Sequence, residues 1–219
     1  MAQTPSVAPP SAANRVILQI DRLSFAYPQR PLFDKLSLTI CAGVTLVRGD
    51  DGSGKSTLLR LLAGDLPAQG GGLVINGVAL HHQPAEYRKQ VFWTDARTQA
   101  FDQLTPEDYW SGVNAGCVGF DTGALSGLVD GLSLAAHIHK PLYMLSTGSR
   151  RKVWLAAAFA SNAPVTLIDD PFAALDKPSI AHVVAQLREV ASRQQRAVVL
   201  ADYTAPPDVP LCAVIELPG

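Results

Sequence analysis

The sequence lacks an excess of charge of either sign. Its 219 residues include 18 Lys and Arg and 19 Asp and Glu, for a formal net charge of -1. Binding to a nucleic-acid backbone requires a basic face, so nucleic acid is not an expected partner. Long apolar runs are also missing, because the stretches at 153–160 and 197–201 fall far short of the roughly 20 residues that cross a bilayer. We therefore expect that the chain does not itself span a membrane.

Cysteine is scarce and scattered. Cys41, Cys117 and Cys212 show no metal-ligand spacing, so neither a disulfide framework nor a zinc site is indicated, and a reducing cytosol fits best. Residues 1–15 have neither the basic start nor the apolar centre of a secretory signal, and their Ala, Pro and Ser content predicts a disordered tail. The remaining residues 16–219 are enough for one well-buried domain.

Strand-like and helix-like segments alternate along residues 16–219. Residues 16–25 and 35–40 have the pattern of two strands separated by a turn, so we expect a strand pair at the edge of the fold. Further strands are expected at residues 44–48, 73–80, 91–94, 165–169, 197–202 and 211–217. Helices are expected at residues 55–63 and 177–191, the second as a crossover between strands. This order predicts an α/β fold.

From residue 101 onward the pattern becomes helical. Thr105 can cap a helix, and Pro106 suits the first helical position. We therefore expect a small helical subdomain over residues 101–163, inserted in a core that is formed by residues 16–100 and 164–219.

A glycine-rich loop joins the strand at 44–48 to the helix that follows. Its sequence is Gly49-Asp50-Asp51-Gly52-Ser53-Gly54-Lys55-Ser56-Thr57. Glycines in such a loop let backbone N–H groups surround phosphates, and the N-terminus of the helix adds its positive end. Lys55 would reach the β- and γ-phosphates of ATP, and the Ser56 hydroxyl would bind Mg²⁺. The sequence thus predicts an ATP site over residues 49–57 in a P-loop NTPase core.

Two carboxylates follow the apolar strand at 165–168. Asp169 is placed to hold Mg²⁺ opposite Ser56, and Asp170 to orient the attacking water. An Asp-Asp-Pro sequence after a strand is also an ordinary turn, but its combination with the glycine-rich loop favours the functional interpretation.

A third motif precedes the helix that leads into this strand: Leu145-Ser146-Thr147-Gly148-Ser149. Ser146 alone would be an ordinary helix cap. Arg150 and Arg151, however, lie in the first helical turn, where cations oppose the helix dipole. An anion facing that end of the helix would relieve the conflict.

Along the chain the three motifs occur in the order 49–57, 145–149 and 169–170, and in this order they resemble the nucleotide-binding domain of ABC transporters over about residues 16–219. The resemblance implies a dimer that holds two ATP molecules between its subunits. Ser146 and Gly148 of one subunit would contact the γ-phosphate bound to the other. Asp176 would belong to the D-loop, which crosses the dimer interface. Tyr27 would stack on adenine, although a core position for this residue is an equal alternative.

The resemblance also implies an ATPase that powers an integral membrane transporter subunit, on the inner face of the cell membrane. The short helical subdomain is similar to that of small bacterial export subunits, including those of haem or cytochrome c biogenesis. Homodimer and heterodimer both remain open. A P-loop kinase is disfavoured because residues 145–148 have no role in one, and a soluble repair-type ATPase because those usually carry long coiled-coil insertions.

Three positions differ from the family's pattern. Asp170 stands where the family usually has Glu, and Ala96 where it has Gln. The place of the switch histidine falls on Tyr203 or, in a shifted register, on Asp202. Possible substitutes for the missing Gln are Asp95, Gln99 and Gln103. With Lys55, we take Asp170 and Tyr203 as the catalytic candidates. The differences support an alternative function, a hydrolysis-poor regulatory subunit of a heterodimer.

Four aromatic residues flank the segment around Ala96. They either line a groove for a cytoplasmic helix of a partner or form the core of the helical subdomain: Trp93, Phe101, Tyr109 and Trp110.

Overall fold

The computed structural model describes residues 6–7, 15–117 and 119–218. A six-stranded sheet forms its centre, and the strands after the first run parallel. The strand order is β1 (Ser6–Val7), β10 (Leu211–Glu216), β4 (Gly43–Arg48), β9 (Ala197–Ala201), β8 (Val165–Asp169) and β7 (Val91–Trp93). Five of these strands were predicted from the sequence, with ends that differ by no more than about a residue, which confirms the α/β fold.

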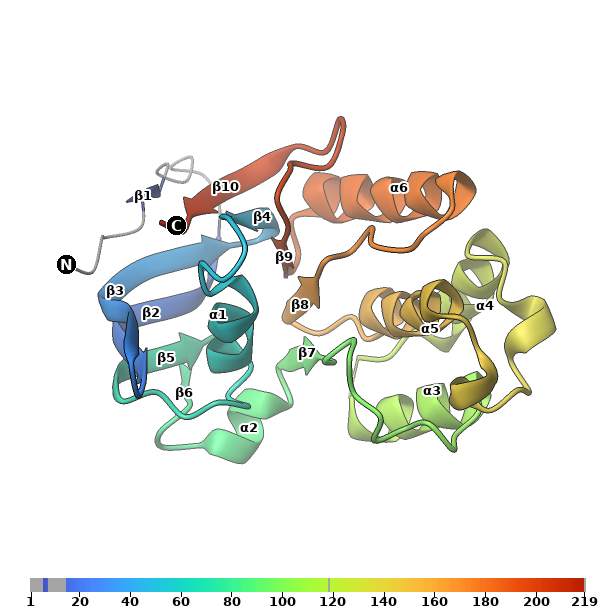
Figure 1. Cartoon of the computed structure of the whole chain (residues 1–219), viewed down its shortest axis with the longest axis horizontal. Coiled ribbons are helices and arrows are strands. Elements are labelled where there is room, and N and C mark those ends of the chain that lie inside the picture. Colours follow the sequence, from blue (N-terminus) through green and yellow to red (C-terminus); the bar gives the residue numbers. More distant parts are fainter. Residues whose placement is uncertain (1–5, 8–14, 118, 219) are drawn as a thin grey trace.

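Helices cover both faces of the central sheet (Figure 1). The helix α1 (Lys55–Leu62) packs on one face, and α5 (Thr147–Ala160) and α6 (Lys177–Arg193) pack on the other. The side chains of β9 alternate between the two faces of the sheet: Val198 packs on the side of α5 and α6, and Val199 on the side of α1. All of β9 is fully buried. Because both faces of the sheet are buried, the central strands have continuous apolar sequences without alternating polar residues.

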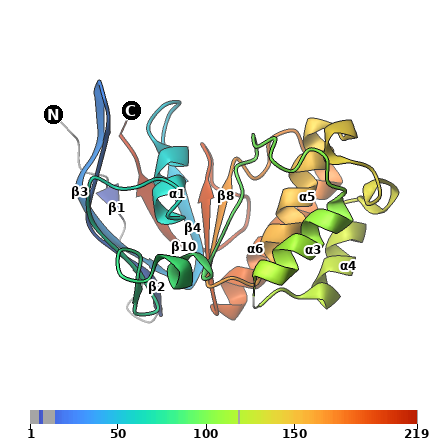
Figure 2. The same cartoon turned by 90° about the horizontal axis from the view of Figure 1, so that it is seen from below.

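A second, antiparallel sheet shares one hydrophobic core with α1. Its strands, in spatial order, are β3 (Arg30–Cys41), β2 (Val16–Tyr27), β5 (Gly70–Ile75) and β6 (Val78–Ala79). Figure 2 places β2 and β3 across the central sheet from the helices α3 to α6. The expected edge pair of strands is confirmed. The single strand predicted at 73–80 is wrong, because Asn76 and Gly77 have φ of 47° and 83° and form a two-residue hairpin turn between β5 and β6.

A short helix that the sequence analysis did not anticipate, α2 (Pro84–Arg88), links the hairpin to β7. Pro84 starts it, and Tyr87 is fully buried, with its hydroxyl donating to the carbonyl of Leu62 at 2.8 Å. Anchored in this way to α1, α2 places Arg88 beside the helical part of the molecule.

The helical part contains α3 (Pro106–Gly116) and α4 (Thr122–Gly131) beside α5, with two 3₁₀ turns at Ala135–His137 and Leu142–Met144. The predicted cap is confirmed, since the Thr105 hydroxyl accepts from the Asp108 N–H at 3.1 Å. Tyr109 and Trp110 are buried, and the Tyr109 ring packs on Trp154 with centroids 4.6 Å apart. These two aromatic residues therefore belong to the core of the helical part.

The predicted disordered tail differs from the structure at Ser6–Val7, which pairs antiparallel with β10. The outer edge of β10 offers unpaired backbone groups, and the two residues satisfy some of them. Residues 1–5 and 8–14 of the predicted tail lie outside the described residues. Within the part of the chain that the structure describes, no helix is long and apolar enough to cross a membrane.

Candidate functional site

The glycine-rich loop connects the end of β4 to α1. A Cβ atom on Gly49 would lie 2.5 Å from the Ser53 hydroxyl and 2.9 Å from the Leu217 carbonyl oxygen, so no larger residue fits. Gly54 starts the helix with a left-handed φ of 100°. Ser53 and Lys55 are buried, and among the described residues the Ser53 hydroxyl has no hydrogen-bond partner. A buried, unpaired hydroxyl at this place is well suited to a phosphate oxygen.

The ammonium group of Lys55 folds back over its own loop. It donates to the carbonyl oxygens of Gly49 and Asp50 at 2.6 and 3.0 Å, and it lies over the Tyr203 ring. The Tyr203 hydroxyl donates to the Asp51 carboxylate. This hydrogen bond raises the pKa of Tyr203 to about 12, so the phenol stays protonated at neutral pH. Tyr203 therefore cannot serve as a general base there.

Ser56 and Asp169 come together from different elements. The Ser56 hydroxyl, in the first turn of α1, is hydrogen-bonded to the Asp169 carboxylate at the end of β8. Burial raises the pKa of Asp169, and this hydrogen bond opposes the shift. A hydroxyl, a carboxylate and phosphate oxygens form the donor set that Mg²⁺ takes in P-loop proteins, so these residues fit the ion. Asp170 follows with a left-handed φ of 47°, and its N–H donates to the Ala201 carbonyl at 2.9 Å.

A cavity of about 360 Å³ joins the glycine-rich loop to these carboxylates. The lining residues are Tyr27, Arg30, Leu32, Asp51, Gly52, Gly54, Lys55, Ser56, Thr57, Arg97, Asp169, Asp170 and Tyr203. The structure thus brings the predicted phosphate, metal and catalytic candidates into one space. Tyr27 is 42% exposed, and its hydroxyl lies 3.3 Å from that of Thr57, so the alternative of a core position for Tyr27 is wrong.

Two arginines in this cavity were missed by the sequence analysis. Arg30 begins β3, and a Cβ atom on Gly52 would lie 3.2 Å from its guanidinium. Arg97 lies in the segment after β7. Neither arginine belongs to a recognisable motif. The only signal in the sequence was that Arg97 directly follows Ala96, the position aligned with the family's Gln.

Residues 145–149 lie outside the cavity of their own chain. Ser146 caps α5, and its hydroxyl accepts from the Ser149 N–H at 3.1 Å. Leu145 is buried, whereas Ser146 and Thr147 are exposed. A Cβ atom on Gly148 would overlap the carbonyl oxygen of Ala174, so this glycine permits a close contact between α5 and the segment after β8.

The cations in the first turn of α5 have partners within the chain. Arg150 forms an ion pair with Asp102 at 3.2 Å and also donates to the Leu142 carbonyl. Arg151 donates to the carbonyl oxygens of both Asp169 and Asp170. The chain itself therefore resolves the conflict with the helix dipole that had suggested an outside anion.

Asp176 caps α6 and pairs with α5. One carboxylate oxygen accepts from the Ser179 N–H at 2.8 Å, and the other lies 2.5 Å from the ammonium group of Lys152. These hydrogen bonds hold the pKa of Asp176 far below its ordinary value. Because the Lys152 side chain is only 10% exposed, Asp176 neutralises a charge that would otherwise be buried alone.

The positions that depart from the family pattern also have definite places. Ala96 packs against the hydrophobic core and does not line the cavity, and neither do Asp95, Gln99 and Gln103. Tyr203, not Asp202, reaches the cavity, which supports the first of the two alignments. No histidine is among the described residues that line it.

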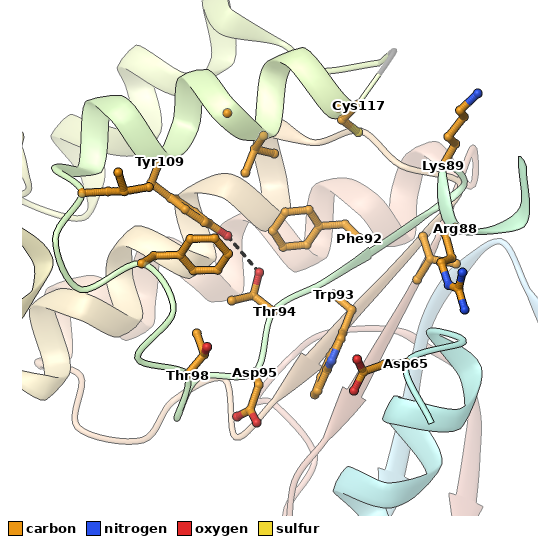
Figure 3. A pocket seen from close by; sticks show the side chains of 16 residues that line it. Asp65, Arg88, Lys89, Phe92, Trp93, Thr94, Asp95, Thr98, Tyr109 and Cys117 are labelled. Carbon is orange, nitrogen blue, oxygen red and sulfur yellow. Dashed lines mark hydrogen bonds between the residues drawn. The ribbon is translucent and has the colours of Figure 1, made fainter. Parts of the chain in front are cut away.

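A separate groove of about 670 Å³ lies between α2, β7 and α3 (Figure 3). The Tyr109 hydroxyl lies 2.8 Å from that of Thr94 across its interior. Trp93 and Phe101 are partly buried and line the groove, Tyr109 is buried in the core and also lines it, and Trp110 is buried without lining it. Each of the two alternatives is therefore correct in part. The exposed charged residues that line the groove are Asp65, Arg88, Lys89 and Asp95.

A parallel sheet with a phosphate-binding loop after β4 and a carboxylate at the end of β8 defines a P-loop nucleotide-binding domain. The chain belongs to the ABC transporter family, whose model matches residues 33–173. It is similar to a cytochrome c biogenesis ATP-binding export protein CcmA from Pseudomonas fluorescens, with 31% identity over 86% of this chain and 90% of the relative. The protein of the same name from Pseudomonas savastanoi is 34% identical over 76% of this chain and 78% of its own length.

Solved structures agree on the fold. An ATP-binding subunit of an ABC transporter superposes with a TM-score of 0.75 at 22% identity, over 84% of this chain and 79% of that one. A bacterial Atm1-family ABC exporter with ATP bound gives a TM-score of 0.69 at 23% identity, over 89% of this chain and 36% of the exporter. The resemblance to an ABC ATP-binding subunit, including one of cytochrome c biogenesis, is thereby confirmed.

Proposed function

We propose that this protein binds and hydrolyses ATP in a dimer of nucleotide-binding domains and thereby powers a membrane transporter subunit. The observation that carries the proposal is the convergence of Lys55, Ser56, Asp169 and Asp170 on one cavity. These groups match, one for one, what phosphoryl transfer to water requires: a cation for the phosphates, two metal ligands and a carboxylate beside the nucleophile.

Each residue has a separate part in the proposed reaction. Lys55 exchanges its two loop carbonyls for phosphate oxygens, and the unpaired Ser53 hydroxyl donates to the same phosphates. Ser56 and Asp169 would hold Mg²⁺, which neutralises phosphate charge when bound. Asp170 orients the attacking water. Tyr27 lines the cavity and is 42% exposed, so its ring can stack on adenine.

The dimer part of the proposal rests on the position of residues 145–149. These residues do not line the cavity of their own chain, and Ser146 and Thr147 are exposed at the N-terminus of α5. A helix N-terminus that faces outward can accept the terminal phosphate of an ATP bound to a second subunit. The partner is a second copy of this chain or a related subunit.

The groove between β7 and α3 is the proposed contact with the membrane subunit. It begins next to the segment that carries Ala96 and Arg97, so its occupant would touch the chain close to the nucleotide cavity. An amphipathic helix would match its apolar interior and charged border. From the names of the relatives, we propose ATP-driven export for cytochrome c biogenesis at the inner face of the cell membrane.

Lys55→Ala tests the nucleotide site. The variant should lose most of its affinity for ATP in calorimetry, because the triphosphate would face only backbone dipoles. Lys140→Ala removes an exposed lysine outside the cavity and should bind like the wild type. Equal ATP affinity of Lys55→Ala and wild type would contradict the assignment of the site.

Two variants of Ser146 test the dimer. Asn and Asp both cap helices as well as Ser, so Ser146→Asn and Ser146→Asp should fold equally well. Only the Asp variant puts a negative charge against the partner's phosphate and should fail to dimerise with ATP in size-exclusion chromatography. Dimerisation of both variants would rule out this face as the contact.

Tyr203 favours a second candidate function, a hydrolysis-poor regulatory subunit. A protonated phenol replaces the histidine of the family's pattern, and Asp170 carries one methylene less than the usual Glu. Steady-state ATPase rates of the purified protein, alone and with a membrane subunit, separate the two functions. A motor accelerates when the membrane subunit is added, whereas a regulatory subunit stays slow in both.

A further inference from the structure

Arg97 is a charged residue of the nucleotide cavity that the proposed reaction leaves without a part. Its N–H donates to the Asp95 carboxylate at 2.9 Å, and the Thr98 N–H donates to the Asp95 carbonyl at 3.0 Å, so a turn fixes the start of the side chain. Its exposed side chain lines the cavity with Lys55, Asp169 and Asp170. Within the described residues it has no hydrogen-bond or ion-pair partner. An arginine oriented into a cavity without a partner is free to bind an anion there.

The electrostatic surroundings place Arg97 at the carboxylate end of the cavity. Its charge acts on Asp169, where it favours the ionised carboxylate, and on Arg151, which it repels. The Tyr27 hydroxyl, in contrast, lies 3.3 Å from that of Thr57, the second residue after Lys55 in the chain. Since Lys55 and Ser56 direct the phosphates toward Asp169, the terminal phosphate would come to lie next to Arg97 and the adenine far from it.

Ala96 explains why an arginine would be useful here. The family usually supplies a glutamine amide near this point, but the Ala96 methyl packs into the core and offers no polar group. The guanidinium of the next residue has five N–H donors in a planar fork, which matches two oxygens of a phosphate. Asp51, Asp169 and Asp170 line the same cavity and can offset the added positive charge.

We propose that Arg97 binds the terminal phosphate of ATP directly and stabilises the charge that builds up on it during transfer to water. The inference rests on the proposed function, because it assumes that ATP occupies this cavity. Arg97 would then distinguish ATP from ADP in the ground state and accelerate hydrolysis in the transition state.

Calorimetric titration of ATP and of ADP, each with EDTA in place of Mg²⁺, tests the contact without relying on activity. Arg97→Ala should weaken ATP binding about tenfold or more and change ADP binding less than about twofold. Arg97→Lys keeps the charge without the fork and should fall between wild type and Arg97→Ala. Arg193→Ala removes an exposed arginine that does not line the cavity and should change neither affinity. Thermal melts establish that each variant is folded.

The rate of hydrolysis at saturating ATP and Mg²⁺ is the second measurement. Arg97→Ala should lower kcat about tenfold or more, and Arg97→Gln, which restores an amide at a neighbouring position, should recover part of the loss. If wild type binds and hydrolyses ATP and Lys55→Ala abolishes both, but Arg97→Ala keeps the wild-type preference for ATP over ADP, only the inference about Arg97 is overturned. Failure of the wild type to bind ATP would overturn the proposed function as well.

Discussion

The ammonium nitrogen of Lys55 lies 4.2 Å from the centroid of the Tyr203 ring. This cation–π contact, together with the two loop carbonyls, holds the lysine inside the cavity before any phosphate arrives. Tyr203 thus supports the lysine of the proposed phosphate site, whereas the sequence analysis assigned it to catalysis.

Titration of Tyr203 should not contribute to the pH dependence of ATP hydrolysis. Its pKa of about 12 keeps it protonated, so the pH profile of kcat between about 6 and 9 should be the same for wild type and Tyr203→Phe. Tyr203→His introduces a group with an ordinary pKa near 6.5 and should add a new limb in that range. An altered profile for Tyr203→Phe would show that the phenol takes part in proton transfer.

Lengthening the carboxylate and restoring the imidazole together should raise activity. We expect Asp170→Glu with Tyr203→His to increase kcat at least several-fold with little change in KM for ATP, since Ser53, Lys55 and Ser56 are unchanged and an aromatic ring remains beside Lys55. The left-handed φ at position 170 suits Asp and Asn better than Glu, so the variant should be somewhat less stable. Asp170→Asn keeps the backbone preference but loses the carboxylate that orients the water, and should be slower than wild type. A double variant no faster than wild type would mean that Asp170 is already competent.

Asp169→Asn should stabilise the nucleotide-free protein while it removes a metal ligand. Burial raises the folded-state pKa of Asp169, so the folded protein loses stability as pH rises from the unfolded pKa through the folded one. At pH 7.5 the variant should therefore have a larger free energy of unfolding and a higher melting temperature than wild type. Below about pH 3, where the carboxyl is protonated in both states, the gain should vanish. A variant less stable than wild type at pH 7.5 would contradict this account.

Gly148→Ala should destabilise the monomer. Its new methyl group would overlap the Ala174 carbonyl, and adjustment of the backbone should cost about 1 to 3 kcal/mol in chemical denaturation. Gly127→Ala in α4 is the matched control, because nothing lies within 4 Å of its Cβ position and the residue is exposed. That control should gain about 0.5 to 1 kcal/mol from helix propensity. Equal stability of the two variants would mean that the contact with Ala174 yields easily.

Gly112→Arg should block the groove without harming the fold. Gly112 lines the groove on α3, is exposed, and has nothing within 4 Å of its Cβ position. A long side chain there should weaken binding to the membrane subunit in pull-down from detergent and abolish the stimulation of ATPase by it. Gly127→Arg, which lies outside the groove on α4, should behave like wild type. Wild-type binding by Gly112→Arg would place the membrane subunit elsewhere.

Local signals made much of the fold and the phosphate loop predictable. The loop around Lys55 is contiguous and flanked by a strand and a helix, so its chemistry can be read from neighbouring residues alone. The hairpin at Asn76 and Gly77 carried an equally local turn signal, but the apolar residues on both sides gave the appearance of one continuous strand.

Contacts between distant segments were beyond the sequence. Nothing near Arg97 indicates that it shares a cavity with Asp169, 72 positions away in the numbering, because the two meet only when β7 pairs with β8. The partners of Arg150 and Arg151 were hidden for the same reason, and a charge conflict within one helix was therefore interpreted as a sign of an outside ligand. The close fit of Gly148 against Ala174 likewise depends on tertiary packing.

Under the proposed function, Arg151 would connect the nucleotide cavity of each subunit to the face that meets the other subunit. It belongs to the first turn of α5, whose N-terminus would meet the neighbour's nucleotide, and its guanidinium donates to the backbone carbonyls of Asp169 and Asp170, beside the proposed metal and water sites. Movement of residues 169–170 after loss of a phosphate would be passed to α5 through one side chain. Under the proposed function, a subunit that has hydrolysed its own ATP would also bind the ATP of the neighbouring subunit less tightly. The two sites would then open together rather than independently.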